Sequence, residues 1–268
     1  MTSLVARTAL AVAISAAGIA LAGTSPAARP LEAIRQRGVV SVCAPPNALP
    51  AASKKGEPRG IQVDLARAIA DRLGVGLEVD WVTEAVMYRR VDCDLVMDAF
   101  VQVEALKELN LSPTTPYQHT GVALLLRPGL DGVTRFDDLP KEARLAVRVG
   151  SAAQYLLGKR GLRAIPFGFE DDMVEAVASG EVDAAAVTPA SAGWYLHQHP
   201  DASLRLVDAY DGEPELSWDL AVGMRRADHA TLRAVDDAVR ALLADGTVGR
   251  IYAAYGVEHR MPGAVATR

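Results

Sequence analysis

Residues 61–81 read IQVDLARAIADRLGVGLEVDW, and this stretch decides the fold class. From Val63 to Leu73 the apolar side chains recur at spacings of three and four, which predicts an amphipathic helix, and Gly74 follows as a C-cap. The run Leu77 to Trp81 then predicts a strand, as does the β-branched run Val39 to Val42 before the helix. Strand, helix, strand in this order is typical of a parallel sheet with a crossover helix.

The same alternation continues along the rest of the chain. A third strand is expected at Asp94 to Met97, and a long apolar strand at Val122 to Leu126 precedes a second α/β block. A strand near Trp218 to Met224 and two terminal helices complete the pattern. The other expected elements are strands at Leu145–Val149, Ala164–Phe167, Val182–Val187 and Leu204–Val207, and helices from Ser151 and at Asp171–Ala178, Pro189–His197, Asp228–Ala244 and Thr247–Tyr255.

Two similar α/β blocks with no long linker predict two lobes, the second inserted into the first. The first lobe would comprise residues 29–120 and 225–268, and the second residues 121–224. Two hinge strands, near 119–126 and 217–224, would join them. Ligands of open α/β sheets bind at the carboxyl ends of the strands, so the cleft between the lobes is the expected binding site.

Residues 1–28 have the layout of a secretory signal peptide. Arg7 precedes an apolar run from Thr8 to Ala22, and small residues that permit cleavage follow, up to Ala28. The run is shorter than the roughly 20 residues of a membrane-spanning helix. We therefore expect export to the periplasm and, because no second run of this length follows, no membrane insertion of the mature chain.

The net charge argues against two classes of partner. It is −5 at pH 7, and removal of residues 1–28 takes away Arg7 and no acid, which makes it −6. Without a stripe of Lys and Arg, nucleic acid is not an expected partner, and no basic amphipathic segment suggests a membrane surface. With 50% hydrophobic and 23% charged residues the chain has globular composition, and it needs no cofactor to hold its core together.

Cys43 and Cys93 are the only two cysteines. In an oxidising compartment we expect a disulfide between them, which the chain-entropy model values at roughly 4 kcal/mol for a loop of this size. Two buried free thiols are the alternative. No neighbouring His or third thiol completes a metal site or a nucleophilic site.

Other chemically suggestive residues carry weaker signals. His197 and His199 resemble half of a metal site, but no Cys or carboxylate is spaced to join them. Asp92, Asp94 and Asp98 are interpreted as solvated strand ends rather than as a hard-cation site. There is no phosphate-binding Gly-rich loop and no nucleophile with its base, so neither a metal nor catalysis is expected.

A set of short motifs runs along the chain in a fixed order. They are Gly60–Ala66, Cys93–Val96, Leu111–Ser112, Thr115–Tyr117, Phe136–Leu139, Ala176–Ala184 and Ala244–Thr247, with Ile251 and Tyr255. Together, over about residues 31–257, they resemble the bacterial extracellular solute-binding proteins of family 3, periplasmic receptors typically paired with amino-acid ABC importers. The resemblance implies a two-lobed periplasmic-binding-protein fold, no catalysis, a small organic ligand and an ABC permease as partner.

A narrower resemblance involves the segment Val42–Pro50, VCAPPNALP, and the pair Cys93-Asp94. Both are similar to the version of the family that is encoded beside quinoprotein alcohol dehydrogenases, where V-C-A-x-P-N-x-L-P and a later C-D recur. The stretch between Trp81 and Cys93 is shorter here, and Tyr88-Arg89-Arg90 stands in place of that group's W-P-x-R-R signature. This resemblance implies an alternative function, as accessory partner of a periplasmic quinoprotein (PQQ-dependent) alcohol dehydrogenase.

The charged anchors of amino-acid receptors have no counterpart at the matching positions. In the family an Arg in a T-x-E-R turn holds the ligand carboxylate through a bidentate contact. Matching Glu104 to the Glu of that turn, and Leu111-Ser112 to the hydrophobe-Ser after it, puts Ala105 at the Arg position. Thr188 stands where the ammonium-binding Asp is expected. An ordinary α-amino acid is therefore not the expected ligand.

The resemblance implies ligand contacts at strand ends and at the two crossings between lobes. Ser151 precedes a helix whose free N–H groups can hold an oxygen or anion, although it could equally be only an N-cap. Asp98 could accept from a ligand donor or cap the segment after Met97, and the three aromatic candidates could stack on a ligand or fill the core. The candidates are Asn47, Leu49, Asp98, Phe100, Tyr117, Ser151, Thr188 and Trp218.

Three functions therefore stay open. Periplasmic cyclohexadienyl dehydratases share the fold, but their carboxylated substrate would need an Arg that Ala105 does not supply, so a binding protein is preferred. Between a transport receptor and a dehydrogenase partner, the surface of the cleft discriminates. Large exposed apolar patches at its mouth favour protein docking, and a deep polar pocket favours transport.

Overall fold

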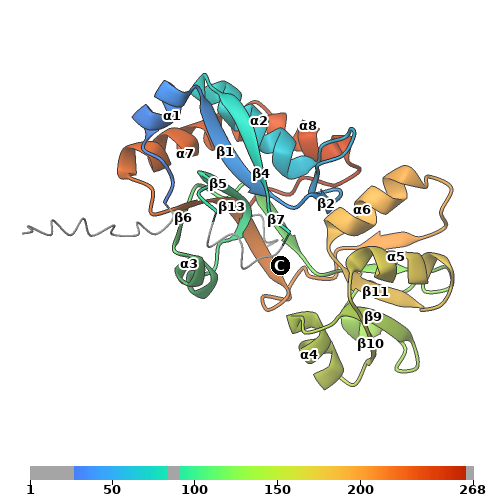
Figure 1. The fold of residues 1–268 in the computed structure, drawn as a ribbon. Helices are drawn as coiled ribbons and strands as arrows, with labels where there is room; N and C mark the ends of the chain where they lie inside the picture. The colour runs from blue at the N-terminus through green and yellow to red at the C-terminus, as the bar shows by residue number, and fades with distance from the viewer. Residues whose placement is uncertain (1–26, 84–90, 264–268) are drawn as a thin grey trace, which may run out of the picture.

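The computed structural model describes residues 27–83 and 91–263. The expected signal peptide falls outside these ranges except for Ala27 and Ala28, and so does Tyr88-Arg89-Arg90. In the described ranges no helix has both the length and the apolar character needed to cross a membrane. The chain forms two lobes, each a sheet flanked by helices, with the second lobe at the lower right in Figure 1.

The first lobe is built on a six-stranded sheet in the order β4-β1-β5-β13-β6, with β7 also paired to β13. β1 (Val39–Ala44) pairs in parallel with β4 (Gly76–Trp81) and with β5 (Leu95–Phe100). β13 (Ser217–Arg225) runs antiparallel to β5, β6 (Leu111–Pro113) and β7 (Gln118–Gly121). A short hairpin, β2 (Asn47–Ala48) with β3 (Ala52–Ser53), follows β1.

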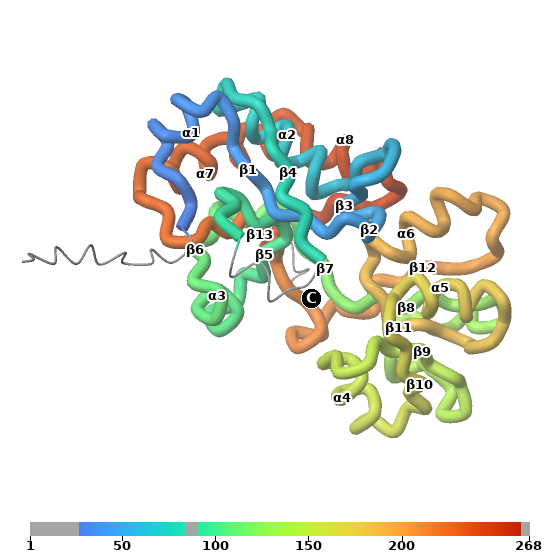
Figure 2. The backbone as a smooth tube through the Cα atoms, in the orientation of Figure 1, coloured from blue at the N-terminus to red at the C-terminus, as the bar shows by residue number. Residues whose placement is uncertain are grey.

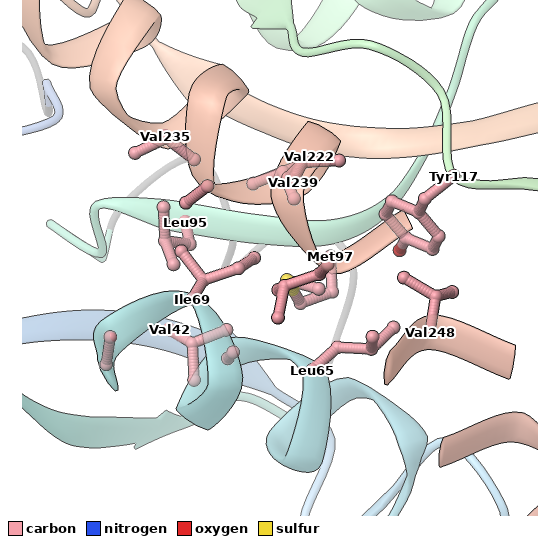
Figure 3. Close-up of a cluster of buried hydrophobic side chains, with 14 of the residues drawn as sticks. Val42, Leu65, Ile69, Leu95, Met97, Tyr117, Val222, Val235, Val239 and Val248 are labelled. Carbon is pink, nitrogen blue, oxygen red and sulfur yellow. The ribbon is translucent and has the colours of Figure 1, made fainter. Parts of the chain in front are cut away.

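Helices cover the first sheet and enclose its core. The expected helix is found as α2 (Ile61–Leu73), and Gly74 ends it in the left-handed conformation, with φ 73°. Its apolar side packs between the sheet and the C-terminal helices, and Figure 3 shows Leu65, Ile69 and Leu95 with Val239 in this core. The other helices of this lobe are α1 (Leu31–Arg37), α3 (Val103–Leu109), α7 (His229–Ala244) and α8 (Thr247–Ala254).

The second lobe is built on a five-stranded sheet in the order β10-β9-β11-β8-β12. Its apolar side chains alternate between two faces, because Leu124 and Leu126 enter one buried cluster and Leu125 the other. The strands are β8 (Ala123–Leu126), β9 (Arg144–Arg148), β10 (Arg163–Phe167), β11 (Ala184–Val187) and β12 (Arg205–Val207), and the helices are α4 (Ala152–Lys159), α5 (Glu170–Ala178) and α6 (Pro189–Gln198), with a 3-10 turn at Phe136–Asp138.

One strand in each sheet runs against the others, and it is the strand that has just crossed from the other lobe. β8 follows the first crossing and runs antiparallel to β11 and β12, while β13 follows the second crossing. Figure 2 traces the green and orange segments that make these crossings. The expected two-lobed α/β fold is confirmed, with each sheet mixed because of the strand that enters it.

The two crossing segments touch at Gly121. Val122 N donates to Leu216 O at 2.8 Å, and Ser217 pairs with Gly121 across the sheet. A Cβ at position 121 would lie 2.4 Å from Leu216 O, so only glycine fits there. β13 pairs with strands of the first sheet although the sequence assigned residues 217–224 to the inserted lobe, and the predicted boundaries stay a prediction.

The predicted disulfide joins Cys43 to Cys93, with their Cα atoms 5.6 Å apart. Cys43 lies in β1 and Cys93 precedes the neighbouring strand β5, so the bond connects two strands that pair directly. Both half-cystines are buried with Val96 and Leu111. The prediction of a disulfide is therefore confirmed.

The interpretation of Asp94 as a solvated strand end is wrong. Its side chain is fully buried and forms an ion pair with Arg29, in which Nη2 lies 2.6 Å from Oδ2. Ser41 N donates to the same oxygen at 2.9 Å, and Arg29 N donates to Oδ1, also at 2.9 Å. A buried carboxylate needs such partners, and here they attach the segment before α1 to the sheet.

Candidate ligand-binding site

A cavity of about 390 Å³ lies between the lobes. Its wall is formed mainly by segments at the carboxyl ends of β1, β5, β9, β10 and β11 and by the start of β13. Two sheets whose strand ends face one cleft place loop and strand-end side chains of both lobes on the same space. The cavity therefore has the position that the sequence predicts for the binding site.

Six of the eight candidate residues line this cavity. The first lobe contributes residues that follow β1, end β5 and begin β13, and the second lobe contributes the residue that follows β11. They are Asn47, Leu49, Asp98, Phe100, Thr188 and Trp218.

Tyr117 and Ser151 are not part of the cavity wall. Tyr117 is buried, and its hydroxyl donates to Asp98 Oδ1 at 2.6 Å and accepts from Asp98 N at 2.8 Å. Ser151 is the N-cap of α4, where its hydroxyl accepts from Gln154 N at 3.1 Å and donates to Arg148 O at 2.7 Å. Tyr117 therefore contacts the site only through Asp98, and Ser151 has the capping role.

Asp98 occupies an unusual backbone position at the cavity. Its φ of 54° lies in the left-handed region, which Asp tolerates better than most residues. Gln62 Nε2 donates to Oδ2 at 2.7 Å, so each carboxylate oxygen has a donor, one from Gln62 and one from Tyr117. Burial raises the pKa of Asp98, and these two hydrogen bonds oppose the rise.

A carboxylate stands beside Thr188, although residue 188 itself is neutral. Glu170, at the start of α5, accepts at Oε2 from Thr188 Oγ1 and Ser191 Oγ, each at 2.6 Å, and from Thr188 N at 3.2 Å. Its other oxygen, Oε1, has no hydrogen bond to any described residue. The carboxylate also lies at the N-terminus of α6, where negative charge is favourable.

Sequence reasoning missed Glu170 and two other charged residues of the wall, Asp171 and Arg148. Burial raises the pKa of Asp171, and the neighbouring carboxylates of Glu170 and Asp172 add to the rise. Arg148 ends β9, is exposed, and forms no ion pair with another described residue. The signal for the acids was present, since the run Glu170-Asp171-Asp172 begins three residues after the strand at Arg163–Phe167 ends.

Aromatic rings form part of the wall in both lobes. Phe100 and Trp218 pack with their ring centroids 5.0 Å apart, tilted by 36°. Phe169 faces the cavity from the second lobe and is 72% exposed. Tyr252 completes the floor and is buried, and burial raises its pKa well above the ordinary value.

Position 105, where the sequence comparison with amino-acid receptors places the carboxylate-binding Arg, is Ala and carries only a methyl group. Ala105 lies in α3 and does not line the cavity.

Among the described residues, no group of three His, Cys, Asp or Glu side chains could hold a metal ion. His199 stacks on Tyr195 with centroids 4.2 Å apart, and His197 packs beside Trp194.

The sequence matches a known protein family over most of its length. The model of the bacterial extracellular solute-binding proteins, family 3, matches residues 40–258. The chain is 26% identical over 203 residues to the amino-acid-binding protein AabA of Dichelobacter nodosus, covering 73% of this chain and 78% of that protein. It is 23% identical over 200 residues to the L-cystine-binding protein TcyJ of Escherichia coli K12, covering 72% of each.

A solved structure shows the same fold. It is an ancestral amino-acid-binding protein described as a precursor of cyclohexadienyl dehydratase, with a TM-score of 0.65 and 22% identity, and the match covers 84% of this chain and 99% of that one. The curated relatives named above are binding proteins, not enzymes.

Proposed function

Because the chain belongs to the bacterial extracellular solute-binding proteins of family 3, we propose that it is the exported receptor of an ABC importer. It closes around a small organic ligand in the cavity between its lobes. One observation carries this proposal: both lobes contribute polar and aromatic side chains to a single cavity of about 390 Å³. A ligand that contacts both lobes stabilises the closed state, which is the signal that a permease reads.

The proposed receptor departs from the amino-acid receptors in how it holds its ligand. Ala105 replaces the Arg that would bind a carboxylate from the first lobe, and Thr188 replaces an ammonium-binding Asp. The family relationship supports an importer of the amino-acid type, and these two positions support a ligand that is not an ordinary α-amino acid. Residues 1–28 act as the cleaved signal peptide that delivers the protein to the periplasm.

Ligand binding can be measured with Trp218, which lines the cavity. We expect a ligand to change its fluorescence and, at 100 times its Kd, to stabilise the fold by roughly 2.7 kcal/mol. The panel comprises amino acids, small amines, short alcohols, organic acids and pyrroloquinoline quinone. Trp218→Phe should remove most of the fluorescence change, and Trp81→Phe, outside the cavity, should keep it. A panel in which no compound raises the melting temperature contradicts the receptor function.

A second candidate function, docking to a periplasmic quinoprotein alcohol dehydrogenase, is favoured by the exposed apolar side chains near the cleft. Phe100 and Phe169 line the cavity from opposite lobes and are 44% and 72% exposed. Val103 begins α3, Val149 lies just before α4, and Tyr155 lies on α4, all exposed. Exposed apolar surface of this kind is typical of protein interaction sites.

The docking function is tested by capture of a purified PQQ-dependent alcohol dehydrogenase on the immobilised protein. We expect Phe169→Ser and Tyr155→Ser to weaken capture, because each removes an exposed ring. Met261→Ser, which changes an exposed apolar residue in the C-terminal segment, serves as the matched control. If the dehydrogenase is not captured, or if neither Phe169→Ser nor Tyr155→Ser weakens its capture, docking at the cleft is refuted.

We further propose that the protein is not an enzyme. The curated relatives are binding proteins, and position 105 lacks the Arg that a carboxylated cyclohexadienyl substrate would need. Incubation with prephenate should therefore yield no phenylpyruvate above the uncatalysed rate. Turnover that is lost in Glu170→Gln would overturn this conclusion.

A further inference from the structure

We propose that the ligand is a small organic amine that carries no carboxylate, held by Glu170 and Asp98 beside the Phe100–Trp218 pair. This inference rests on the proposed function, since it names the class of solute that the same cavity receives. Four features of the cavity support it: the positions of the carboxylates, the net negative charge of the wall, the absence of a carboxylate-binding Arg at position 105, and the aromatic pair.

The carboxylate of Glu170 is arranged as an acceptor for one further donor. Three donors from Thr188 and Ser191 hold Oε2 in place, and Oε1 makes no hydrogen bond with a described residue. An ammonium group has three N–H donors and no acceptor, so it complements this oxygen. A charge-assisted bond of this type is about twice as strong as one between neutral groups.

The charge of the wall selects against anions. Among the described residues, Asp98, Glu170 and Asp171 supply three carboxylates and Arg148 the one guanidinium. The carboxylates come from both lobes, so an amine between them would attract both sides of the cleft. A ligand carboxylate near these groups would meet repulsion instead, and in a partly buried site that repulsion is weakly screened.

The first lobe offers no cation to compensate a ligand carboxylate within the described part of the wall. The residue at the family's clamp position is Ala105, and the donors around Asp98 are the neutral side chains of Gln62 and Tyr117. Arg148 belongs to the second lobe and is exposed at the end of β9. The Arg148→Gln variant therefore tests whether this guanidinium binds a ligand carboxylate.

The aromatic pair gives the site a surface that accepts a cation. Phe100 and Trp218 lie 5.0 Å apart between centroids, and both line the cavity with Asp98. Aromatic faces attract ammonium groups, and their apolar area also covers the methylene groups of an alkylamine. A diamine or guanidino-amine would use both properties in a cavity of about 390 Å³.

The test compares matched pairs that differ only in the α-carboxylate: putrescine with ornithine, cadaverine with lysine, and agmatine with arginine. Titration calorimetry on the mature protein should give at least one amine a Kd about tenfold or more below that of its amino acid. Glu170→Gln should raise the Kd of that amine by about tenfold. Glu175→Gln, on the same helix but outside the cavity, should leave it unchanged.

A second variant keeps the test decisive if Glu170→Gln lowers the melting temperature. Asp171→Asn removes the charge of a second carboxylate in the same lobe and wall, and it should raise the Kd of the amine a few-fold. Arg148→Gln removes a positive charge that repels the cationic amine, and it should lower the Kd of the amine.

Two outcomes overturn the inference in different ways. An amino acid that binds as tightly as its amine, or more tightly, refutes the amine ligand and leaves the receptor function intact; loss of that binding in Arg148→Gln would then identify Arg148 as the carboxylate clamp. The amine ligand is likewise refuted, and the receptor function left intact, if no amine binds while another compound of the broad panel raises the melting temperature. No response to any compound refutes both the amine ligand and the receptor function.

Discussion

The carboxylate of Asp183, in the second lobe, is held by two arginines, Arg144 and Arg127. It accepts from Arg144 N at 2.7 Å and from Arg144 Nε at 3.1 Å, and Arg127 Nη2 lies 2.7 Å from its Oδ1. The hydrogen bonds from Arg144, with the charge of Arg127, lower the pKa of Asp183 to about 2. The side chain thus connects the segments that follow β8, begin β9 and precede β11.

We expect Asp183→Asn to lower the free energy of unfolding at pH 7 by up to about 2 kcal/mol, because it removes the preference of the folded state for the ionised form. The pKa is depressed in the folded state, so the stabilisation is present above the ordinary value of 3.8 and is lost as pH falls through about 2. Urea unfolding of both proteins from pH 7 to pH 2 measures this.

The two unfolding free energies should therefore converge below pH 4. Asp201→Asn, at an exposed turn position, should follow the wild-type curve at every pH. A constant difference between wild type and Asp183→Asn across the whole range would mean that packing, not charge, explains the loss.

At the scale of elements, β1 organises the first lobe. It pairs with β4 on one side and β5 on the other, and the crossover helix α2 packs against this part of the sheet. The segment after β1 enters the cavity wall with Asn47 and Leu49. The bond between Cys43 and Cys93 therefore restrains two neighbouring strands that both lead into the site.

We expect the double variant Cys43→Ser, Cys93→Ser to lose about 4 kcal/mol of unfolding free energy, because a separation of 50 residues is no longer closed in the unfolded chain. Urea unfolding measures the loss, and reduced wild-type protein should unfold at a similar urea concentration. An unchanged midpoint in both samples would show that residual contacts between the β1 and β5 segments already restrain the unfolded chain without the disulfide.

At the scale of the whole molecule, α6 bridges the two lobes beside the cavity. Its N-terminal turn carries Ser191 in the cavity wall, and Trp194 packs against Tyr255 of the first lobe with centroids 5.7 Å apart. Gly193 meets Gly256 so closely that a Cβ at 193 would lie 2.6 Å from Gly256 O. This contact is possible only with glycine on α6.

We expect Gly193→Ala to oppose closure of the lobes, because the added methyl group must displace backbone at Gly256. A cost of about 1.4 kcal/mol in the closed state would raise the ligand Kd about tenfold. Small-angle X-ray scattering with saturating ligand should give a larger radius of gyration than for wild type.

The matched control is Gly132→Ala, where a Cβ would meet no atom within 4 Å. It should bind ligand and close like the wild type. If Gly193→Ala also closes and binds like the wild type, the contact between α6 and Gly256 has no part in closure.

The amino-acid sequence by itself determined the local elements and the general position of the site. The helix at 61–73 was predictable because its apolar spacing and Gly74 act over a few residues. Asn47, Asp98 and Thr188 were predictable as a group because strand ends meet at one edge of a sheet. The disulfide followed from two cysteines and an expected oxidising compartment.

Only the tertiary structure decided which partners those residues have. Asp94 pairs with Arg29 across 65 residues, and the hydroxyl of Tyr117 turns to Asp98 instead of to the cavity. Glu170 accepts a hydrogen bond from the hydroxyl of Thr188, so a carboxylate from another helix lies beside position 188, where the sequence has a neutral residue. Periodicity and motifs report on contacts within one element, whereas these contacts depend on how sheets and helices pack, which no local pattern records.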